Sequence, residues 1–243
     1  MEILQNFKET NLAGGVVSSL IVILIMIILA IYIGIRAHFQ DPLKRPKGML
    51  LVAEVGVTFF EGMAEGLLGK NFRSFGGYLM AIGVYMFIAF IFGLTGLPSP
   101  ITYMAIPLSL GLSTFMLIHA TAIKYNKFRY IKRYIEPVPL FLPINLISMW
   151  APLLSLTLRI FGNALSGFVI MSIIYFGLES ASASIFSALE ASVGEWNSVF
   201  LAPLVTWIFH LYFDLWAGFI QTTVFLSLTA IYVGQECPED LVG

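Results

Sequence analysis

The chain has 243 residues, of which 58% are hydrophobic and only 11% are charged, and its formal net charge is −1. Soluble domains carry about 25% charged residues, so this composition excludes a soluble globular protein. Several uncharged stretches exceed the ~20 apolar residues that cross a bilayer, which predicts an all-α, multi-span membrane protein. The single cysteine, Cys237, excludes an internal disulfide and a cysteine-based metal site. The N-terminus lacks the basic segment of a signal peptide, so no removable leader is expected.

Residues 14–35 are uncharged and form the first predicted membrane span. A basic segment follows it, and residues 49–71 then mix apolar residues with glutamates. Glu61 and Glu65 are four residues apart and therefore share one helical face. This pattern is typical of a helix at the membrane surface, so we expect 49–71 to lie there rather than to span the bilayer.

Residues 74–96 and 102–123 form the second and third predicted spans, and Pro107 interrupts the third. The basic residues indicate the topology, because cytoplasmic loops are enriched in lysine and arginine. Of the 13 basic residues, six lie between 36 and 73 and five lie between 124 and 133. Two spans separate these clusters, so both are expected on the cytoplasmic side, with the N-terminus outside.

The last two membrane segments, 137–178 and 199–235, are too long for upright spans. The first carries no charge except Arg159, and as a helix it would be about 60 Å long, twice the ~30 Å hydrocarbon core. It forms either two short spans or one strongly tilted helix, and the lack of a turn-forming cluster favours the tilted helix. The stretch 179–198 is predicted as a polar loop or surface helix with three glutamates, Glu179, Glu190 and Glu195. Five segments in one membrane domain, 1–243, place the C-terminus in the cytoplasm.

Two ionisable side chains, Arg159 and Asp214, stand well inside the last two membrane segments. Each costs roughly 2.5–3.5 kcal/mol at a helix centre on insertion scales, which indicates a functional site. Residues three, four and seven positions apart share a helical face. The face of Arg159 holds Ser148, Ser155, Asn163 and Ser166, and the face of Asp214 holds His210 and Gln221. Two facing polar stripes of this kind predict a wet path through the membrane, and Gly162, Gly167 and Gly218 are expected to allow close approach of neighbouring helices.

Simpler interpretations stay open for these residues. Arg159 is either a functional charge or a structural partner of Asp214, and it is too far from the ends of its apolar run to reach the surface. His210 is either a packed, hydrogen-bonded histidine or a proton relay. The serines, Asn163 and Gln221 also suit interhelical hydrogen bonds. His210 and Asp214 have no third ligand in the sequence pattern, so no metal or other cofactor is expected.

The choice of arginine rather than lysine at position 159 has a chemical reason. A guanidinium stays protonated when it is desolvated, whereas a buried lysine readily loses its proton. A permanent positive charge holds a nearby carboxylate ionised, and away from that charge, in lipid, the same carboxylate must take up a proton or another cation. This asymmetry is what an ion-driven motor or pump requires.

Three segments resemble a known family. The arginine motif of subunit a of the rotary F-type ATP synthase is similar to residues 155–167, SLTLRIFGNALSG. That family's last helix is similar to residues 212–234, YFDLWAGFIQTTVFLSLTAIYVG, and its first cytoplasmic segment and surface helix are similar to residues 45–63, RPKGMLLVAEVGVTFFEGM. The resemblance implies a stator subunit whose last two helices form a tilted hairpin along a rotating ring of c subunits. It also implies b-type stalk subunits and the rest of the ATP synthase as partners, no nucleic acid, and the plasma membrane of a prokaryote.

The resemblance also implies roles for individual residues. Arg159 matches the family's essential arginine, Asn163 the asparagine that follows it, and Gln221 the glutamine on the facing helix. Asp214 matches a position where the family carries an acid or a histidine in the half-channel open to the outside. This chain departs from many bacterial members in having Phe168 where they have glutamate. Asp214 is therefore expected to be the main titrating group of that half-channel.

The expected function is to provide two proton half-channels with the arginine between them, which couples ion translocation to ring rotation and to ATP synthesis or hydrolysis. The chain is not expected to be an enzyme on its own. A self-contained multi-span ion transporter or channel is the alternative, but it predicts internal repeats and paired broken helices, which the sequence lacks. An inert membrane scaffold is a further alternative, and it leaves the pair of motifs unexplained.

Overall fold

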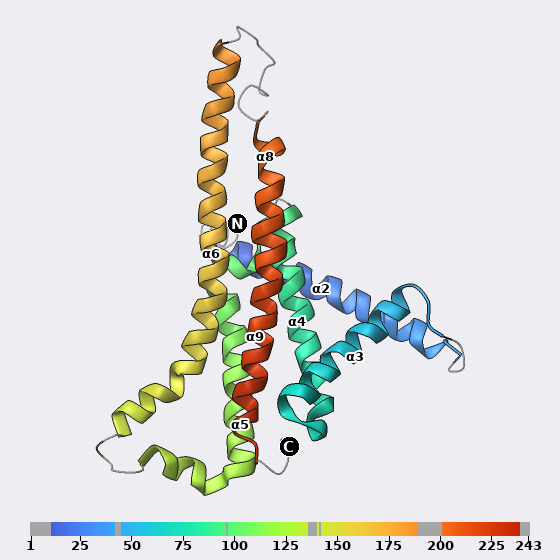
Figure 1. Cartoon of the computed structure of the whole chain (residues 1–243), viewed down its shortest axis with the longest axis vertical. Coiled ribbons are helices and arrows are strands. Elements are labelled where there is room, and N and C mark those ends of the chain that lie inside the picture. The colour runs from blue at the N-terminus through green and yellow to red at the C-terminus, as the bar shows by residue number, and fades with distance from the viewer. Residues whose placement is uncertain are drawn as a thin grey trace, which may run out of the picture.

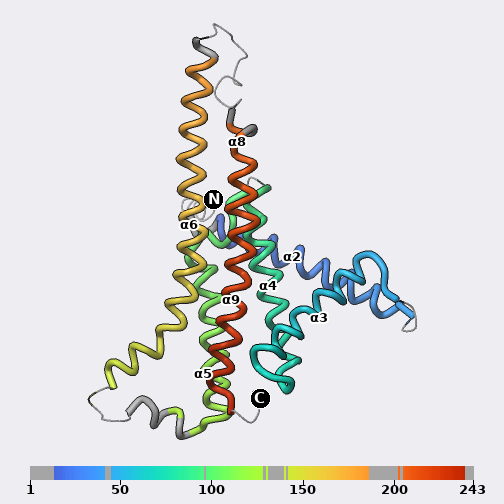
Figure 2. Tube along the Cα trace, in the orientation of Figure 1, coloured from blue at the N-terminus to red at the C-terminus, as the bar shows by residue number. Residues whose placement is uncertain are grey.

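The computed structural model describes residues 11–41, 45–95, 97–135, 140, 142–188 and 201–238, and all regular structure within them is helical (Figures 1 and 2). Five helical segments in this part of the chain are apolar and long enough to cross a membrane: Gly14–His38, Lys70–Thr95, Ala105–Lys127, Leu142–Ile185 and Val205–Gly234. The predicted fold class, an all-α multi-span membrane protein, is confirmed.

The first two helices meet at the basic segment that the sequence places between them. Helix α2 (Asn11–His38) crosses the other long helices obliquely, and α3 (Met49–Leu68) runs from its far end back to the bundle (Figure 1). A short 3-10 helix, η1 (Lys70–Phe75), follows α3. There the guanidinium of Arg73 donates to the carboxylate of Glu61 on α3 at 2.7 Å. This ion pair links α3 to η1, which precedes the next helix.

Helix α4 (Gly76–Ile91) continues into the 3-10 helix η2 (Phe92–Thr95), and a second 3-10 helix, η3 (Pro100–Thr102), leads into α5 (Ala105–Ile135). The predicted third span ended at 123, where the charged residues begin, but α5 continues well beyond it. Charged residues limit the part of a helix that can lie in the membrane, but they do not end the helix itself. A kink at Lys127, where φ is 45° and ψ is −125°, separates the apolar part of α5 from its basic end.

Helix α6 (Leu142–Ala188) is one continuous helix of 47 residues, about 70 Å at 1.5 Å per residue, rather than two short spans. It also includes the first part of the predicted 179–198 loop, because that stretch contains no helix-breaking residue before its end. Glu179 is therefore helical and exposed, whereas Glu190 and Glu195 lie outside the described residues. Pro152 lies inside α6, and the first part of this helix is bent away from the rest (Figure 1), as proline's missing backbone donor explains.

The last membrane segment consists of α8 (Leu201–His210), a π-helical segment, η5 (Leu211–Trp216), and α9 (Ala217–Gly234). It lies side by side with α6 as a long hairpin (Figures 1 and 2). Of the glycines expected to allow close approach, Gly218 does so most clearly, because an added Cβ would lie 2.7 Å from Cβ of Phe90 on α4. An added Cβ at Gly167 would make ordinary contact with Phe213 at 3.5 Å, and one at Gly162 would meet nothing.

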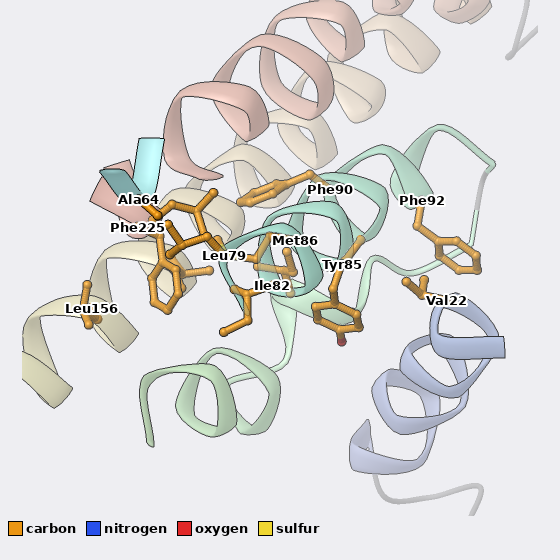
Figure 3. Close-up of a cluster of buried hydrophobic side chains, with 14 residues drawn as sticks. Val22, Ala64, Leu79, Ile82, Tyr85, Met86, Phe90, Phe92, Leu156 and Phe225 are labelled. Atoms are coloured by element: carbon orange, nitrogen blue, oxygen red, sulfur yellow. The ribbon is translucent and has the colours of Figure 1, made fainter. Parts of the chain in front are cut away.

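A cluster of buried apolar side chains joins α4 to the hairpin (Figure 3). Leu79, Met86 and Phe90 come from α4, Leu156 from α6 and Phe225 from α9. Lipid tails are as apolar as these side chains, so close van der Waals packing rather than the hydrophobic effect holds such helices together. This packing fixes α6 and α9 relative to α4, and it thereby positions the polar residues of the hairpin.

Candidate functional site: a polar cavity in the long hairpin

A cavity of about 640 Å³ lies between the end of α4, the η2–η3 connection and the α6–α9 hairpin. One water molecule occupies ~30 Å³ in the liquid, so the cavity has room for many. Most of its lining residues are apolar, and we call it the polar cavity after the polar side chains among them. Its polar lining consists of Ser99, Thr102, Asn163, Ser172, Tyr175, His210 and Asp214. The structure therefore brings together three of the residues predicted from the sequence, namely Asn163, His210 and Asp214.

A chain of hydrogen bonds crosses the wall of the polar cavity. Nδ1 of His210 lies 2.6 Å from Oδ2 of Asp214, and Nε2 of the same ring lies 2.8 Å from the hydroxyl of Tyr175 on α6. When Asp214 is ionised and His210 neutral, Nδ1–H donates to the carboxylate and Nε2 accepts from the phenol. About a quarter of each of the two side chains, 25% for His210 and 24% for Asp214, remains exposed. Both ends of the histidine are thus occupied by groups that can exchange a proton with it.

The π-helical segment sets the position of Asp214. A π turn contains one residue more than an α turn, so it changes which residues of α8 and α9 share a face. Asp214 lies within this segment, one turn after His210, and an added Cβ at Gly93 would lie 3.5 Å from its Oδ1. This glycine of η2 carries no side chain, so that side of the carboxylate is unfilled. Such π segments often occur at functional sites.

Arg159 does not line the polar cavity. Its side chain is exposed, and its guanidinium makes one hydrogen bond, to Oγ of Ser155, at 3.5 Å. Within the described residues the ion pair of Asp214 is with His210, and no pair joins Asp214 to Arg159. The interpretation of Arg159 as a structural partner of Asp214 is therefore not supported. Asn163 is one helical turn from Arg159 on α6, so the cavity wall ends about 6 Å from the arginine along the helix.

Apolar side chains are exposed on both arms of the hairpin. Leu158, next to Arg159 in the chain, is 52% exposed, and Ile220 on α9 is 45% exposed. A Cβ added at Gly162 would have no neighbouring atom within 4 Å. Arg159 is the only basic residue in α6. It is exposed on the hairpin, with Ser155 and Asn163 one helical turn away on either side.

The other polar residues predicted from the sequence do not share one environment. The hydroxyl of Ser166 donates within its own helix, to the carbonyls of Gly162 at 2.7 Å and Asn163 at 3.1 Å. Ser148 is exposed. Gln221 is only 7% exposed and is absent from the cavity lining, and its Nε2 has no hydrogen-bond partner in the described part of the chain.

Tyr175 is the functional candidate that the sequence reasoning missed. It follows Asn163 on α6 at intervals of four residues, through Gly167 and Met171, and all four line the polar cavity. This spacing was visible in the sequence, but the predicted polar face stopped short of Tyr175. In the described residues no group of three histidine, cysteine, aspartate or glutamate side chains could hold a metal ion.

The fold and the cavity define a multi-pass α-helical membrane protein with an acid–histidine pair between its longest helices. The family model for the ATP synthase A chain matches residues 16–234. ATP synthase subunit a of Mycoplasmoides gallisepticum is 30% identical over 225 residues, which cover 89% of this chain and 75% of that protein. ATP synthase subunit a of Bacillus subtilis is 28% identical over 249 residues, covering 96% and 94%. The chain therefore belongs to the ATP synthase A chain family, the subunit a family of the F-type ATP synthase, which confirms the resemblance seen in the sequence.

Proposed function

We propose that the polar cavity is the proton half-channel through which this ATP synthase stator subunit loads a rotating ring of c subunits from outside. The observation that carries the proposal is the hydrogen-bonded series Tyr175–His210–Asp214 in the cavity wall. Asn163 extends the cavity to within one helical turn of Arg159. Proton-exchanging groups therefore lead toward the one basic residue of α6.

The position of the cavity relative to the basic residues supports entry from outside. The cavity is lined by residues that follow α4 and precede α5, among them Gly93 and Thr102. The basic residues lie at the opposite ends of these helices, in η1 before α4 and near the end of α5 (Figure 1). Since basic residues favour the cytoplasmic side, the cavity belongs to the other side. The same rule places the N-terminus outside and the C-terminus in the cytoplasm.

The exposed apolar side chains of the hairpin suit the c-subunit ring. A ring of membrane helices presents apolar side chains and one carboxylate per subunit, and the open space beside Gly162 allows its close approach. The guanidinium of Arg159 keeps the arriving carboxylate ionised, because it stays charged in a desolvated setting. It also repels protons, and thereby prevents their direct passage between the outside path and a second path to the cytoplasm.

The cycle proceeds as follows. A proton passes from the cavity, through His210 and Asp214, to a ring carboxylate that has just left Arg159, and the neutral carboxylic acid turns into lipid. It reaches the cytoplasmic path after nearly a full turn, releases the proton and meets Arg159 as an anion. One elementary charge crossing 100 mV supplies about 2.3 kcal/mol, so several protons pass per ATP made. Ser155 holds the guanidinium on α6, and Ser166 on α6 and Gln221 on the facing helix are the further polar residues that we assign to the proton path.

Phe168 lines the same cavity as Asp214. Many bacterial members have a glutamate in place of this phenylalanine, so one acid of the cavity has been replaced while Asp214 supplies another. This favours Asp214 as the titrating group. The c-ring is the expected partner of the hairpin. The b-type stalk subunits are the expected partners of the helices outside the hairpin.

Purification in mild detergent tests the assignment. The chain should co-purify with c-ring and stalk subunits, and the reconstituted complex should pump protons on addition of ATP. The purified chain alone in liposomes should conduct no protons. Sustained ion flux by the chain alone would instead identify a self-contained transporter, and a stable monomer without ring or stalk subunits would contradict the stator role.

A further inference from the structure

A second cavity, of about 710 Å³, lies between the end of α2 and the start of α3, far from the polar cavity of the hairpin (Figure 1). Three exposed basic side chains line it, namely Arg36, Arg45 and Lys47. Tyr32 lines it as well, and its hydroxyl accepts from Nε of Arg36 at 3.3 Å. The guanidinium carbon of Arg36 also lies 5.6 Å from the centre of the Tyr32 ring, which orients this cation beside the cavity. We call this the basic pocket.

Positive charge exceeds negative charge around the basic pocket. Three of the residues that line it are lysine or arginine, and no aspartate or glutamate is among its described lining residues. Among the described residues, no ion pair joins Arg45 or Lys47 to a carboxylate. Helix α3 begins beside the pocket at Gly48 without a side-chain cap, so its first backbone N–H groups add partial positive charge. The chemistry of the pocket therefore favours an anion.

The surfaces on either side of the basic pocket are apolar. On α2, Ile28, Ile31 and Ile35 are 58%, 57% and 55% exposed, and these residues belong to a candidate membrane span that ends at His38. On α3, Val55 and Phe59 are each 60% exposed, and both line an adjoining, mainly apolar groove that Arg45 and Glu54 also line. Arg45 thus lies where the basic pocket and this groove meet.

We propose that the basic pocket binds the phosphate headgroup of an anionic phospholipid whose acyl chains cover the exposed faces of α2 and α3. Guanidinium groups match phosphate oxygens with paired hydrogen bonds, and an ammonium adds a point charge. Basic pockets where membrane helices reach the side with the basic loops are suited to such headgroups. The flanking apolar groove distinguishes a lipid from free phosphate, which would leave that groove empty. The bound lipid joins the end of α2 to the start of α3.

Native mass spectrometry of the full-length chain in detergent tests the proposal, with phosphatidylglycerol and phosphatidylcholine as probes. The unaltered chain should bind phosphatidylglycerol in preference to phosphatidylcholine. The double variant Arg45→Gln, Lys47→Gln should bind phosphatidylglycerol about 25-fold more weakly, at about five-fold per basic charge. The double variant Lys70→Gln, Lys124→Gln removes the same charge elsewhere and should bind as the unaltered chain does.

An equal loss in both double variants would overturn the proposal, because it would show only a response to net charge. Displacement of the lipid by millimolar inorganic phosphate would also overturn it, by showing a site for the free anion. A second measurement needs no variant. Phosphatidylglycerol should slow acylation of Lys47 by an amine-reactive reagent several-fold while leaving Lys70 unchanged, and equal protection of both lysines would contradict the proposal.

Discussion

The hydroxyl of Tyr175 on α6 lies 2.8 Å from Nε2 of His210 at the end of α8. These two residues lie 35 positions apart in the sequence, and the hydrogen bond joins the two arms of the hairpin directly. His210 is in turn bound to Asp214 one turn along its own helix. Each member of the series holds the next in place, so the effect of removing one hydroxyl can be separated from the effect of removing the acid.

Replacing Tyr175 by phenylalanine should lower ATP-driven proton pumping several-fold, up to about ten-fold. The ring still fills its place, and the lost hydrogen bond is worth roughly 0.5–1.5 kcal/mol. Pumping by the purified complex in vesicles, measured by quenching of a pH-sensitive dye, checks this effect.

Tyr212→Phe is the matched control for this variant. Tyr212 is 56% exposed and does not line the polar cavity, so its hydroxyl should be dispensable. Equal activity of Tyr175→Phe and Tyr212→Phe would remove Tyr175 from the proton path.

Replacing Asp214 by asparagine should reduce proton flux by at least ten-fold without loss of assembly. The amide keeps the size of the carboxyl group but cannot take up and release the proton. Asp214 makes its ion pair within its own helix segment, so subunit packing should survive. Passive proton conductance of vesicles and the subunit composition of the purified complex are the two measurements. Glu54→Gln, an exposed carboxylate on α3, serves as the control and should retain full conductance.

Replacing Arg159 by alanine should abolish coupled ATP synthesis, since no charge remains to meet the ring carboxylate or to separate the two paths. The isolated subunit should stay as stable as before, because the arginine side chain is exposed and makes only one long hydrogen bond. Lys124→Ala is the control for the loss of one basic residue. ATP synthesis at the normal rate by the Arg159→Ala complex would refute the role assigned to position 159.

Much of this architecture was accessible from the sequence. Uncharged runs predict the membrane helices, because each long apolar run satisfies its backbone only as a helix. The isolated charges Arg159 and Asp214 indicate that the hairpin is functional, because a charged side chain inside the membrane costs free energy. The pairing of Asp214 with His210 follows from a spacing of four residues.

The remaining features depend on local geometry that residue patterns do not report. The π segment has no sequence marker, so a helical periodicity of 3.6 does not show which residues of α8 and α9 share a face. The end of α6 was also misplaced, because polar residues after 178 indicate an exposed stretch but not a break in the helix. The Tyr175–His210 bond requires the relative register of two helices, which no single-helix periodicity supplies.

Replacing Gly218 by valine should destabilise the subunit by about 1–3 kcal/mol, the usual cost of overpacking a well-packed contact. An added Cβ there would lie 2.7 Å from Cβ of Phe90, and neither helix can move without disturbing the buried cluster of α4 and α9. Thermal unfolding in detergent measures the loss. Gly162→Ala, whose added Cβ meets no neighbour, is the control and should cost nothing.

The thiol of Cys237 offers a pH-dependent test of the C-terminal end of the last helix. Burial raises the pKa of Cys237, nearby Glu236 raises it further, and Lys124 lowers it. Since maleimides react with the thiolate, labelling of the folded chain should keep rising at pH values where a free cysteine is already fully ionised. The same chain in denaturant should reach its plateau at lower pH. Lys124→Gln should move the folded profile to higher pH, because it removes a positive charge that favours the thiolate.

A membrane-impermeant maleimide should label Cys237 only from the cytoplasmic side. Identical folded and denatured pH profiles would show that folding does not bury the thiol enough to raise its pKa.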